Sequence, residues 1–320
     1  LESVVVGWVG FVPGILHVVV LWKFPLQSRR AFLDKYENIG FHDWHCVVPH
    51  YKRDDGREEI DMMVGCYYPT GSTDSQQYPD VSLLIEGQVD SVGLSLMQGI
   101  SPSVFSWISR FGCGVMKNAP IIQEEKFIPV IFSHGNGMSR TLYSNVCRSM
   151  ASSRAKVVVF SVGHGDGSAC SYKTPNTKEV KYYESHTSEH EKAGITVKAL
   201  KVRQAGRRAE EATSLVHHLF NGKGELFPGL SREQLDLSQL TIAGQSFGCS
   251  TSTSCGQIDS RIKNCILLDP WLRPNEGRGD LVPCLKQKTL IVCTEVFNQV
   301  FLKYGYNNLD YLRQILDYNN

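Results

Sequence analysis

One segment of the chain has residue types and spacing that suit nucleophilic catalysis. Gly244, Ser246 and Gly248 form a G-x-S-x-G pattern that directly follows the apolar run 240–243. This pattern is typical of a sharp turn between a strand and a helix, where small residues on either side leave room for a strained serine backbone. Such a turn projects the serine hydroxyl from the sheet and leaves the next amide, that of Phe247, free to donate. Ser246 is therefore the candidate nucleophile, and an ordinary glycine–serine turn is the alternative.

A serine hydroxyl needs an imidazole to take its proton and a carboxylate to orient that imidazole. Asp269 follows the next apolar run, 265–268, and lies 23 positions after Ser246. In folds that use this serine turn, the acid lies at the end of a later strand. Asp269 is therefore the candidate acid, with a turn-forming role before proline as its alternative. Glu295, after the following apolar run, is the fallback acid.

Negative charge that develops on a reacting carbonyl oxygen needs hydrogen-bond donors. The segment 134–137, His-Gly-Asn-Gly, comes shortly after the apolar run 129–132. Its glycines allow the loop to turn backbone N–H groups toward the nucleophile, so the amides of Asn136 and Phe247 are the expected donors. A glycine-rich connection without a catalytic role is the alternative. Two further candidates for lining the site are His134 and His164.

The elements that must position these residues follow from apolar patterning. Short apolar runs rich in β-branched residues predict strands over 63–68, 129–132, 156–160, 240–243, 265–268 and 289–293. Most are continuous rather than alternating, which is typical of parallel strands covered on both faces. The strongest helix candidate, 197–220, has an apolar stripe at helical spacing. The alternation predicts an α/β fold with a mostly parallel central sheet and helices on both faces.

Taken in order, the motifs resemble the platelet-activating factor acetylhydrolases, the calcium-independent group VII phospholipases A2. The similar segments run from about residue 62 to residue 300: FSHGNG at 132–137, RTLYS at 140–144, HGDGS at 164–168, VRQ at 202–204, GQSFG at 244–248 and LDPWLRP at 268–274. Gly165 stands where the family's H-R-D-G-S has arginine, and Gln245 stands where its G-H-S-F-G has histidine. The resemblance implies an α/β-hydrolase with Ser246 as nucleophile, Asp269 as triad acid, and Asn136 and Phe247 as oxyanion donors.

A histidine base is expected after the acid, yet none of the 10 histidines follows Asp269. Three explanations stay open. In the first, the chain belongs to a longer product whose further residues supply the base, so that the hydrolase domain 31–320 is incomplete at its C-terminal end. In the second, the base has been lost. In the third, another histidine, such as His164, acts as the base. Because removal of a triad base usually costs orders of magnitude in turnover, the chain as given is expected to be nearly inactive.

Composition limits the classes of function. The 33 Lys+Arg and 32 Asp+Glu residues give a formal charge of +1, which argues against a nucleic-acid partner, and 42% hydrophobic residues exclude intrinsic disorder. None of the 10 cysteines forms a C-x-x-C pair, so mostly reduced thiols are expected. No metal and no organic cofactor is expected.

Two apolar segments indicate contact with lipid. Residues 3–22 carry no charge and are followed by Lys23, Arg29 and Arg30. The length suits a bilayer span of about 20 residues, which favours a membrane anchor within 1–30 and a domain on the cytoplasmic face. A cleaved signal with secretion and a buried or interfacial segment are alternatives. The second segment, 92–116, is an insertion over the sheet edge, a surface helix at a lipid interface, or a core helix.

Residues and resemblance together predict a serine-dependent carboxylic ester hydrolase. The expected activity is that of a 1-alkyl-2-acetylglycerophosphocholine esterase, which removes an sn-2 acetyl or another short or oxidised acyl group from a phospholipid. The resemblance also implies a membrane or lipoprotein surface as partner. A catalytically inactive, membrane-associated lipid-binding relative and a generic lipase or thioesterase are the alternatives.

Overall fold

The computed structural model describes residues 38–52, 59–123, 126–276, 278, 281, 285–303, 306–307, 310 and 312–314. The apolar segment 3–22, and with it the predicted membrane anchor, lies outside these residues. Within the described ranges, no helix combines the length and the apolarity that crossing a membrane requires.

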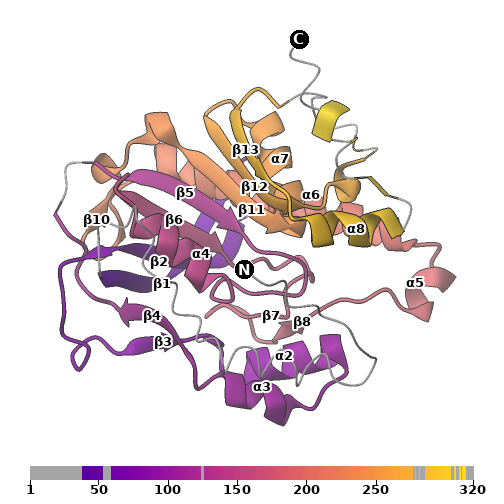
Figure 1. The fold of residues 1–320 in the computed structure, drawn as a ribbon, viewed down its shortest axis with the longest axis horizontal. Helices are drawn as coiled ribbons and strands as arrows, with labels where there is room; N and C mark the ends of the chain where they lie inside the picture. The colour runs from indigo at the N-terminus through magenta and orange to yellow at the C-terminus, as the bar shows by residue number, and fades with distance from the viewer. Residues whose placement is uncertain are drawn as a thin grey trace.

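A nine-stranded sheet in the order β13-β12-β11-β5-β6-β2-β1-β4-β3 forms the centre of the molecule (Figure 1). Its strands are β1 (Asn38–Pro49), β2 (Glu59–Thr70), β3 (Asp80–Ser82), β4 (Gly112–Lys117), β5 (Ile128–Ser133), β6 (Val157–Val162), β11 (Thr241–Ser246), β12 (Asn264–Pro270) and β13 (Lys288–Val292). The five strands from β13 to β6 are parallel to their neighbours, whereas β2 is antiparallel to both β6 and β1. The predicted mostly parallel sheet is confirmed, and each predicted strand is present. Most ends lie within two residues of the prediction, but β2 begins four residues earlier than predicted and β11 ends three residues later.

Three strands of the sheet, β1, β3 and β4, were not predicted. The longest of them, β1, pairs along its whole length with β2 in antiparallel register. Its burial pattern is mixed, with partly exposed and buried residues following one another. A half-exposed strand of this kind lacks the continuous apolar run by which the parallel strands were predicted.

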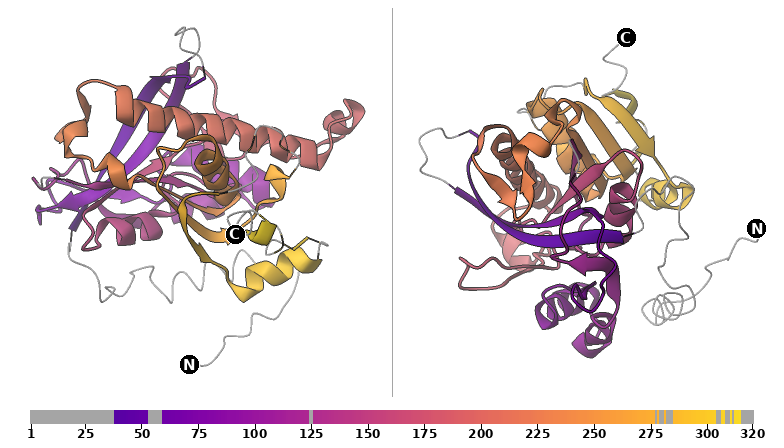
Figure 2. Two further views of the ribbon diagram at one scale, coloured as in Figure 1. Left: turned by 90° about the horizontal axis from the view of Figure 1, so that it is seen from above. Right: turned by 90° about the vertical axis from the view of Figure 1, so that its left-hand side faces the viewer.

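Helices cover both faces of the sheet because the side chains of each inner strand alternate between the two faces. Phe160 of β6 packs in the same hydrophobic cluster as Leu215 of α6 (Val197–Asn221). Its neighbour Val159 packs on the opposite side with Cys147 of α4 (Ser144–Ala151). The long helix α6 runs across the molecule (Figure 2), and α7 (Phe247–Ile258) packs beside it.

The apolar segment 92–116 is not a core helix. It forms most of α2 (Gln88–Gln98), all of α3 (Pro102–Ile108) and most of β4. None of the residues of α3 is buried, and Leu96 of α2 is 64% exposed. The two helices lie together beyond the end of the sheet formed by β4 and β3 (Figure 1). The segment is therefore an addition at the sheet edge, and its contact with lipid stays a prediction.

The carboxyl ends of β5, β6, β11 and β12 meet at one edge of the sheet, because these strands run in the same direction. In open α/β sheets this edge is where ligands bind. The candidate nucleophile, acid and oxyanion donors all lie at these carboxyl ends or directly after them. The other described elements are β7 (Ser171–Tyr172), β8 (Lys181–Tyr182), α5 (Ser188–Lys192), β9 (Glu225–Phe227), β10 (Leu230–Ser231), α8 (Glu295–Lys303) and three single 3-10 turns at Arg232–Gln234, Leu237–Gln239 and Arg273–Asn275.

Candidate active site

Ser246 is the last residue of β11, and α7 begins at the next residue, Phe247. The backbone of Ser246 has φ 52° and ψ −115°, a conformation that a residue with a side chain rarely adopts. Such a conformation costs roughly 1–3 kcal/mol and persists only where the surroundings enforce it. An amide in the first turn of a helix has no acceptor within the helix, so the N–H of Phe247 points out of α7. The strained strand-to-helix turn predicted from the sequence is present.

Gly244 allows this turn to close tightly. A β-carbon on Gly244 would overlap the carbonyl group of Gly248, the second residue of α7. Any side chain at position 244 would therefore push β11 and α7 apart. This is the physical reason for a small residue two positions before the serine.

Asp269 lies at the carboxyl end of β12, the strand next to β11. Ser246 is paired in register with Pro270, and the N–H of Trp271 donates to the carbonyl oxygen of Ser246 at 3.1 Å. Asp269 itself has a positive φ of 46°, and its Oδ1 accepts a hydrogen bond of 2.6 Å from the backbone N–H of Thr294. The structure thus brings the candidate acid and the candidate nucleophile to neighbouring positions at the same sheet edge.

The alternative acid, Glu295, has a different environment. Glu295 is the first residue of α8, its side chain is exposed, and its Oε1 accepts from Gln299 Nε2 at 3.0 Å. This contact lies within one helix, between residues four apart. The geometry therefore favours Asp269 as the acid.

The loop after β5 passes directly beside the nucleophile. A β-carbon on Gly135 would lie 3.5 Å from Cβ of Ser246. The side chain of the next residue, Asn136, is turned toward other partners: its Nδ2 donates to Tyr183 Oη at 3.0 Å, and its Oδ1 accepts from Lys201 Nζ at 3.0 Å. Only the backbone N–H of Asn136 is therefore left for the donor role predicted from the sequence.

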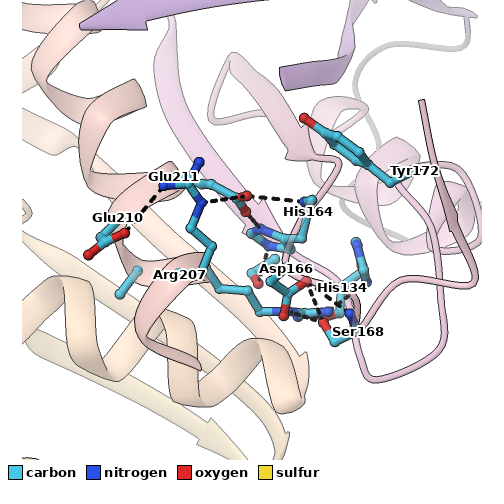
Figure 3. A network of polar contacts seen from close by, with 12 residues as sticks. His134, His164, Asp166, Ser168, Tyr172, Arg207, Glu210 and Glu211 are labelled. Carbon is cyan, nitrogen blue, oxygen red and sulfur yellow. Dashed lines mark hydrogen bonds and ion pairs between the residues drawn. The ribbon is translucent and has the colours of Figure 1, made fainter. Parts of the chain in front are cut away.

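His164 lies beneath the site rather than on an exposed wall of it. Its side chain is completely buried, its Nε2 is 2.8 Å from Ser133 Oγ, and its Nδ1 is 2.7 Å from Glu211 Oε2 (Figure 3). Burial disfavours the charged form of both partners: it lowers the pKa of His164 and raises the pKa of Glu211 to about 7. Both ring nitrogens of His164 are thus hydrogen-bonded to residues other than Ser246. The geometry therefore does not support His164 as the base that takes the serine proton.

His134 is completely buried as well. Its Nδ1 donates to the carbonyl oxygen of Gly135 at 2.8 Å, and its Nε2 has no hydrogen-bond partner among the described residues. Burial, followed by the positive charge of Arg208, lowers the pKa of His134 well below its usual range. The imidazole is therefore neutral near neutral pH and packs under the loop 134–137.

Two basic residues that the sequence did not single out border the turn, and both come from α6. The ammonium of Lys201 lies 5.5 Å from the ring centroid of Phe247, and the guanidinium carbon of Arg208 lies 4.6 Å from it. Burial lowers the pKa of Lys201 to about 8. Positive charge beside the nucleophile turn favours a developing oxyanion. The signal that identifies them is their spacing of seven residues, which places both on one helical face.

The described residues also show the state of the cysteines and whether side chains are grouped so that they could bind a metal ion. All nine described cysteines are free thiols, and eight of them are buried. In the part of the chain that the structure describes, no three His, Cys, Asp or Glu side chains are grouped so that they could hold a metal ion.

Comparisons with known proteins agree with this geometry. A family model described as "Platelet-activating factor acetylhydrolase, isoform II" matches residues 55–303. A platelet-activating factor acetylhydrolase from Gallus gallus is 27% identical over 257 residues, which cover 72% of this chain and 59% of that protein. The protein of the same name from Canis lupus familiaris is 26% identical over 226 residues, 65% of this chain and 49% of its own length. The chain thus spans about half to three fifths of the length of these curated relatives.

Among solved structures, a ferulic acid esterase from Streptomyces cinnamoneus superposes with a TM-score of 0.56 at 16% identity. The superposition covers 88% of this chain and 72% of the esterase. At this identity the likeness shows the fold alone. The fold is that of an α/β-hydrolase, as the sequence predicted.

Proposed function

Because the chain belongs to the family of platelet-activating factor acetylhydrolase, isoform II, we propose that it is a serine-dependent phospholipid esterase. Its substrate is a glycerophospholipid with an sn-2 acetyl or another short or oxidised acyl group. The observation that supports the proposal best is the strained turn at Ser246, with the loop at Gly135 so close that a β-carbon on Gly135 would lie 3.5 Å from Cβ of Ser246. Nucleophile and oxyanion loop are adjacent in this arrangement.

The reaction follows from the positions of these groups. Ser246 Oγ attacks the carbonyl carbon of the sn-2 ester, and the amides of Asn136 and Phe247 stabilise the negative oxygen. The tetrahedral intermediate then releases the lysophospholipid hydroxyl and leaves an acyl-serine, which water hydrolyses to free the acid. Asp269 orients the base that takes the serine proton and then returns it to the departing lysophospholipid oxygen. No histidine of the sequence follows Asp269, and His164 is hydrogen-bonded to Ser133. The first quantity to measure is therefore the reactivity of the Ser246 hydroxyl.

Fluorophosphonate labelling of the full-length protein tests this proposal. The expected result is one covalent adduct on the peptide that contains Ser246, and its loss in Ser246→Ala. Ser250→Ala is the matched control, because Ser250 lies on α7 and its hydroxyl donates to the carbonyl oxygen of Trp271. Absence of a Ser246 adduct in the wild type, with Ser250→Ala behaving the same, would contradict the enzyme and favour the inactive lipid-binding relative.

The addition at the sheet edge supports a lipid surface as partner. Leu96 is 64% exposed on α2, and Phe111, after α3, is 37% exposed. The neighbour of Leu96, Met97, packs onto the oxyanion loop, because a β-carbon on Gly137 would overlap its sulfur. A membrane or lipoprotein surface that holds α2 therefore lies next to the proposed site.

Co-sedimentation with phosphatidylcholine vesicles tests this second part. Leu96→Glu is expected to reduce the bound fraction, because a carboxylate does not partition into the lipid interface. Val197→Glu is the control, since Val197 is 56% exposed at the start of α6, outside the sheet-edge addition. Equal binding of wild type and Leu96→Glu would show that α2 does not contact the lipid.

A further inference from the structure

A single buried arginine connects three segments around the proposed site. Arg208 is completely buried and lies on α6. Its Nη1 donates to the carbonyl oxygen of His134 at 2.5 Å, and its Nε donates to Ser168 Oγ at 2.7 Å and to Asp166 Oδ2 at 3.2 Å. Its guanidinium also lies over the ring of Phe247. Arg208 thus contacts the loop after β5, the loop after β6 and the turn after β11.

These contacts reach both ends of the oxyanion loop. Arg208 binds the first residue of the loop, His134, directly. It binds the last residue through Ser168, since the carbonyl oxygen of Ser168 accepts from the N–H of Gly137 at 2.6 Å. Figure 3 shows Asp166, Ser168 and His134 gathered at one place below His164. The only loop residues between the two held ends are Gly135 and Asn136.

Stability alone does not explain this arrangement. Arg208 and Asp166 form an ion pair in which both side chains are completely shielded from solvent. Such a pair loses hydration energy, and well-packed apolar residues in its place are often as stable or more stable. A guanidinium, unlike an ammonium, presents several donors in a rigid planar fork. The fork fixes the relative positions of a carbonyl, a hydroxyl and a carboxylate from two different loops.

We propose that Arg208 is a positioning residue for the oxyanion loop. By holding His134 directly and Gly137 through Ser168, it sets the distance between the amide of Asn136 and Ser246. Its positive charge also lies beside Phe247, whose amide is the second donor. The inference rests on the proposed function, because only a reacting ester presents an oxyanion to this loop.

The test compares four variants of the full-length protein. Arg208→Gln and Arg208→Lys remove the fork, and Ser168→Ala removes one of its acceptors with little change in volume. Arg232→Gln is the matched control: Arg232 is also buried, at 7% exposure, and its guanidinium donates to the carbonyl oxygens of His218 and Gly224 rather than to the site. The readouts are hydrogen exchange at the amide of Gly137 and the rate at which a small fluorophosphonate modifies Ser246.

Both Arg208 variants are expected to speed exchange at Gly137 at least about 10-fold and to slow phosphonylation about 10- to 100-fold, somewhat less than loss of a whole oxyanion donor. Ser168→Ala is expected to speed exchange at Gly137 and to slow phosphonylation as well, each to a smaller degree. If the Arg208 variants do not fold, Ser168→Ala tests whether the Arg208 contacts position the loop. Arg232→Gln lowers the thermal midpoint but leaves both readouts of the folded protein within about two-fold.

Two results overturn the proposal. One is unchanged exchange and phosphonylation in folded Arg208→Gln, or in Ser168→Ala where the Arg208 variants do not fold. The other is an equal change in Arg208→Gln and Arg232→Gln, which would show a general effect on the fold. If the wild type is not phosphonylated at all, the proposed function fails, while exchange at Gly137 still decides whether Arg208 positions the loop.

Discussion

The hydroxyl of Tyr143 donates a hydrogen bond of 2.5 Å to Oε1 of Gln245, the residue before Ser246. The same hydroxyl lies 2.6 Å from the position that a β-carbon on Gly135 would occupy. One phenol therefore touches both the nucleophile turn and the oxyanion loop. Burial raises the pKa of Tyr143 to about 12, so the hydroxyl remains a donor at all pH values near neutrality. Gln245, which stands where the family motif has histidine, thus has a defined partner.

Tyr143→Phe tests this contact. The ring stays packed on Phe132, 5.3 Å between centroids, but Gln245 Oε1 loses its donor. We expect a loss of about 0.5–1.5 kcal/mol in the free energy of unfolding, the usual net contribution of a hydrogen bond, because the two partners are only partly buried. The phosphonylation rate of Ser246 should fall as well, because the turn and the loop lose their common contact. Urea unfolding and labelling kinetics measure the two effects.

A double variant is the control for Tyr143→Phe. Gln245→Met removes the acceptor, so Tyr143→Phe combined with Gln245→Met should cost less than the sum of the two single substitutions. Strict additivity would show that the two side chains do not interact.

The fit of α7 against β5 makes a second prediction. A β-carbon on Gly248 would overlap the carbonyl oxygen of Ser133, so Gly248→Ala must displace α7 or β5. We expect Gly248→Ala to destabilise the protein by about 3 kcal/mol or more, as overpacking against rigid backbone does. Gly206→Ala is the matched control, because Gly206 lies inside α6 and a β-carbon there meets nothing within 4 Å.

Gly206→Ala should stabilise the protein by about 0.5–1 kcal/mol, since alanine loses less backbone entropy than glycine in a helix. Urea unfolding of both variants measures these changes. If Gly248→Ala is as stable as the wild type, α7 does not approach Ser133 as closely as the structure places it.

The dependence of stability on pH makes a third prediction. Burial, aided by the positive charge of Arg232, whose Nη2 lies 3.0 Å from His218 Nε2, lowers the pKa of His218 to about 4. Below the ordinary histidine pKa of about 6.5 the unfolded chain binds a proton on this residue that the folded protein does not bind. Protons in this window therefore favour unfolding, and the free energy of unfolding falls as the pH drops from about 6.5 to about 4.

His218→Gln should flatten this fall relative to the wild type. The comparison between the two proteins is needed because Glu211, with a pKa raised to about 7, acts in the opposite direction. Unfolding curves at pH 7.5 and at pH 5 measure the difference. If both proteins lose the same stability between these pH values, His218 is not held neutral in the folded state.

The parts of the molecule that could be predicted from the sequence are those set by local pattern. The turn at Ser246 needs small neighbours and a preceding apolar strand, and both can be read within one segment. Asp269 could be placed because the carboxyl ends of parallel strands meet at one edge. The parallel strands themselves are continuous apolar runs, since they are buried on both faces.

The parts that were missed depend on packing between distant segments. Lys201 and Arg208 have the composition of a solvated helix face, yet the loops after β5 and β6 bury them. The strand β1 is half exposed and has no continuous apolar run. His134 and His164 were expected to line the site, and only the tertiary contacts show that both point into the interior.

The most direct test of the central claim is the release of acetate from 1-alkyl-2-acetylglycerophosphocholine by the full-length protein, beside Ser246→Ala and a 2-palmitoyl substrate. The account predicts that the wild type releases acetate, that Ser246→Ala lowers the rate by at least about 1,000-fold, and that the palmitoyl ester reacts more slowly. No acetate from the wild type, or the same rate with Ser246→Ala, would contradict it. Equal rates on the two substrates would instead indicate a generic lipase.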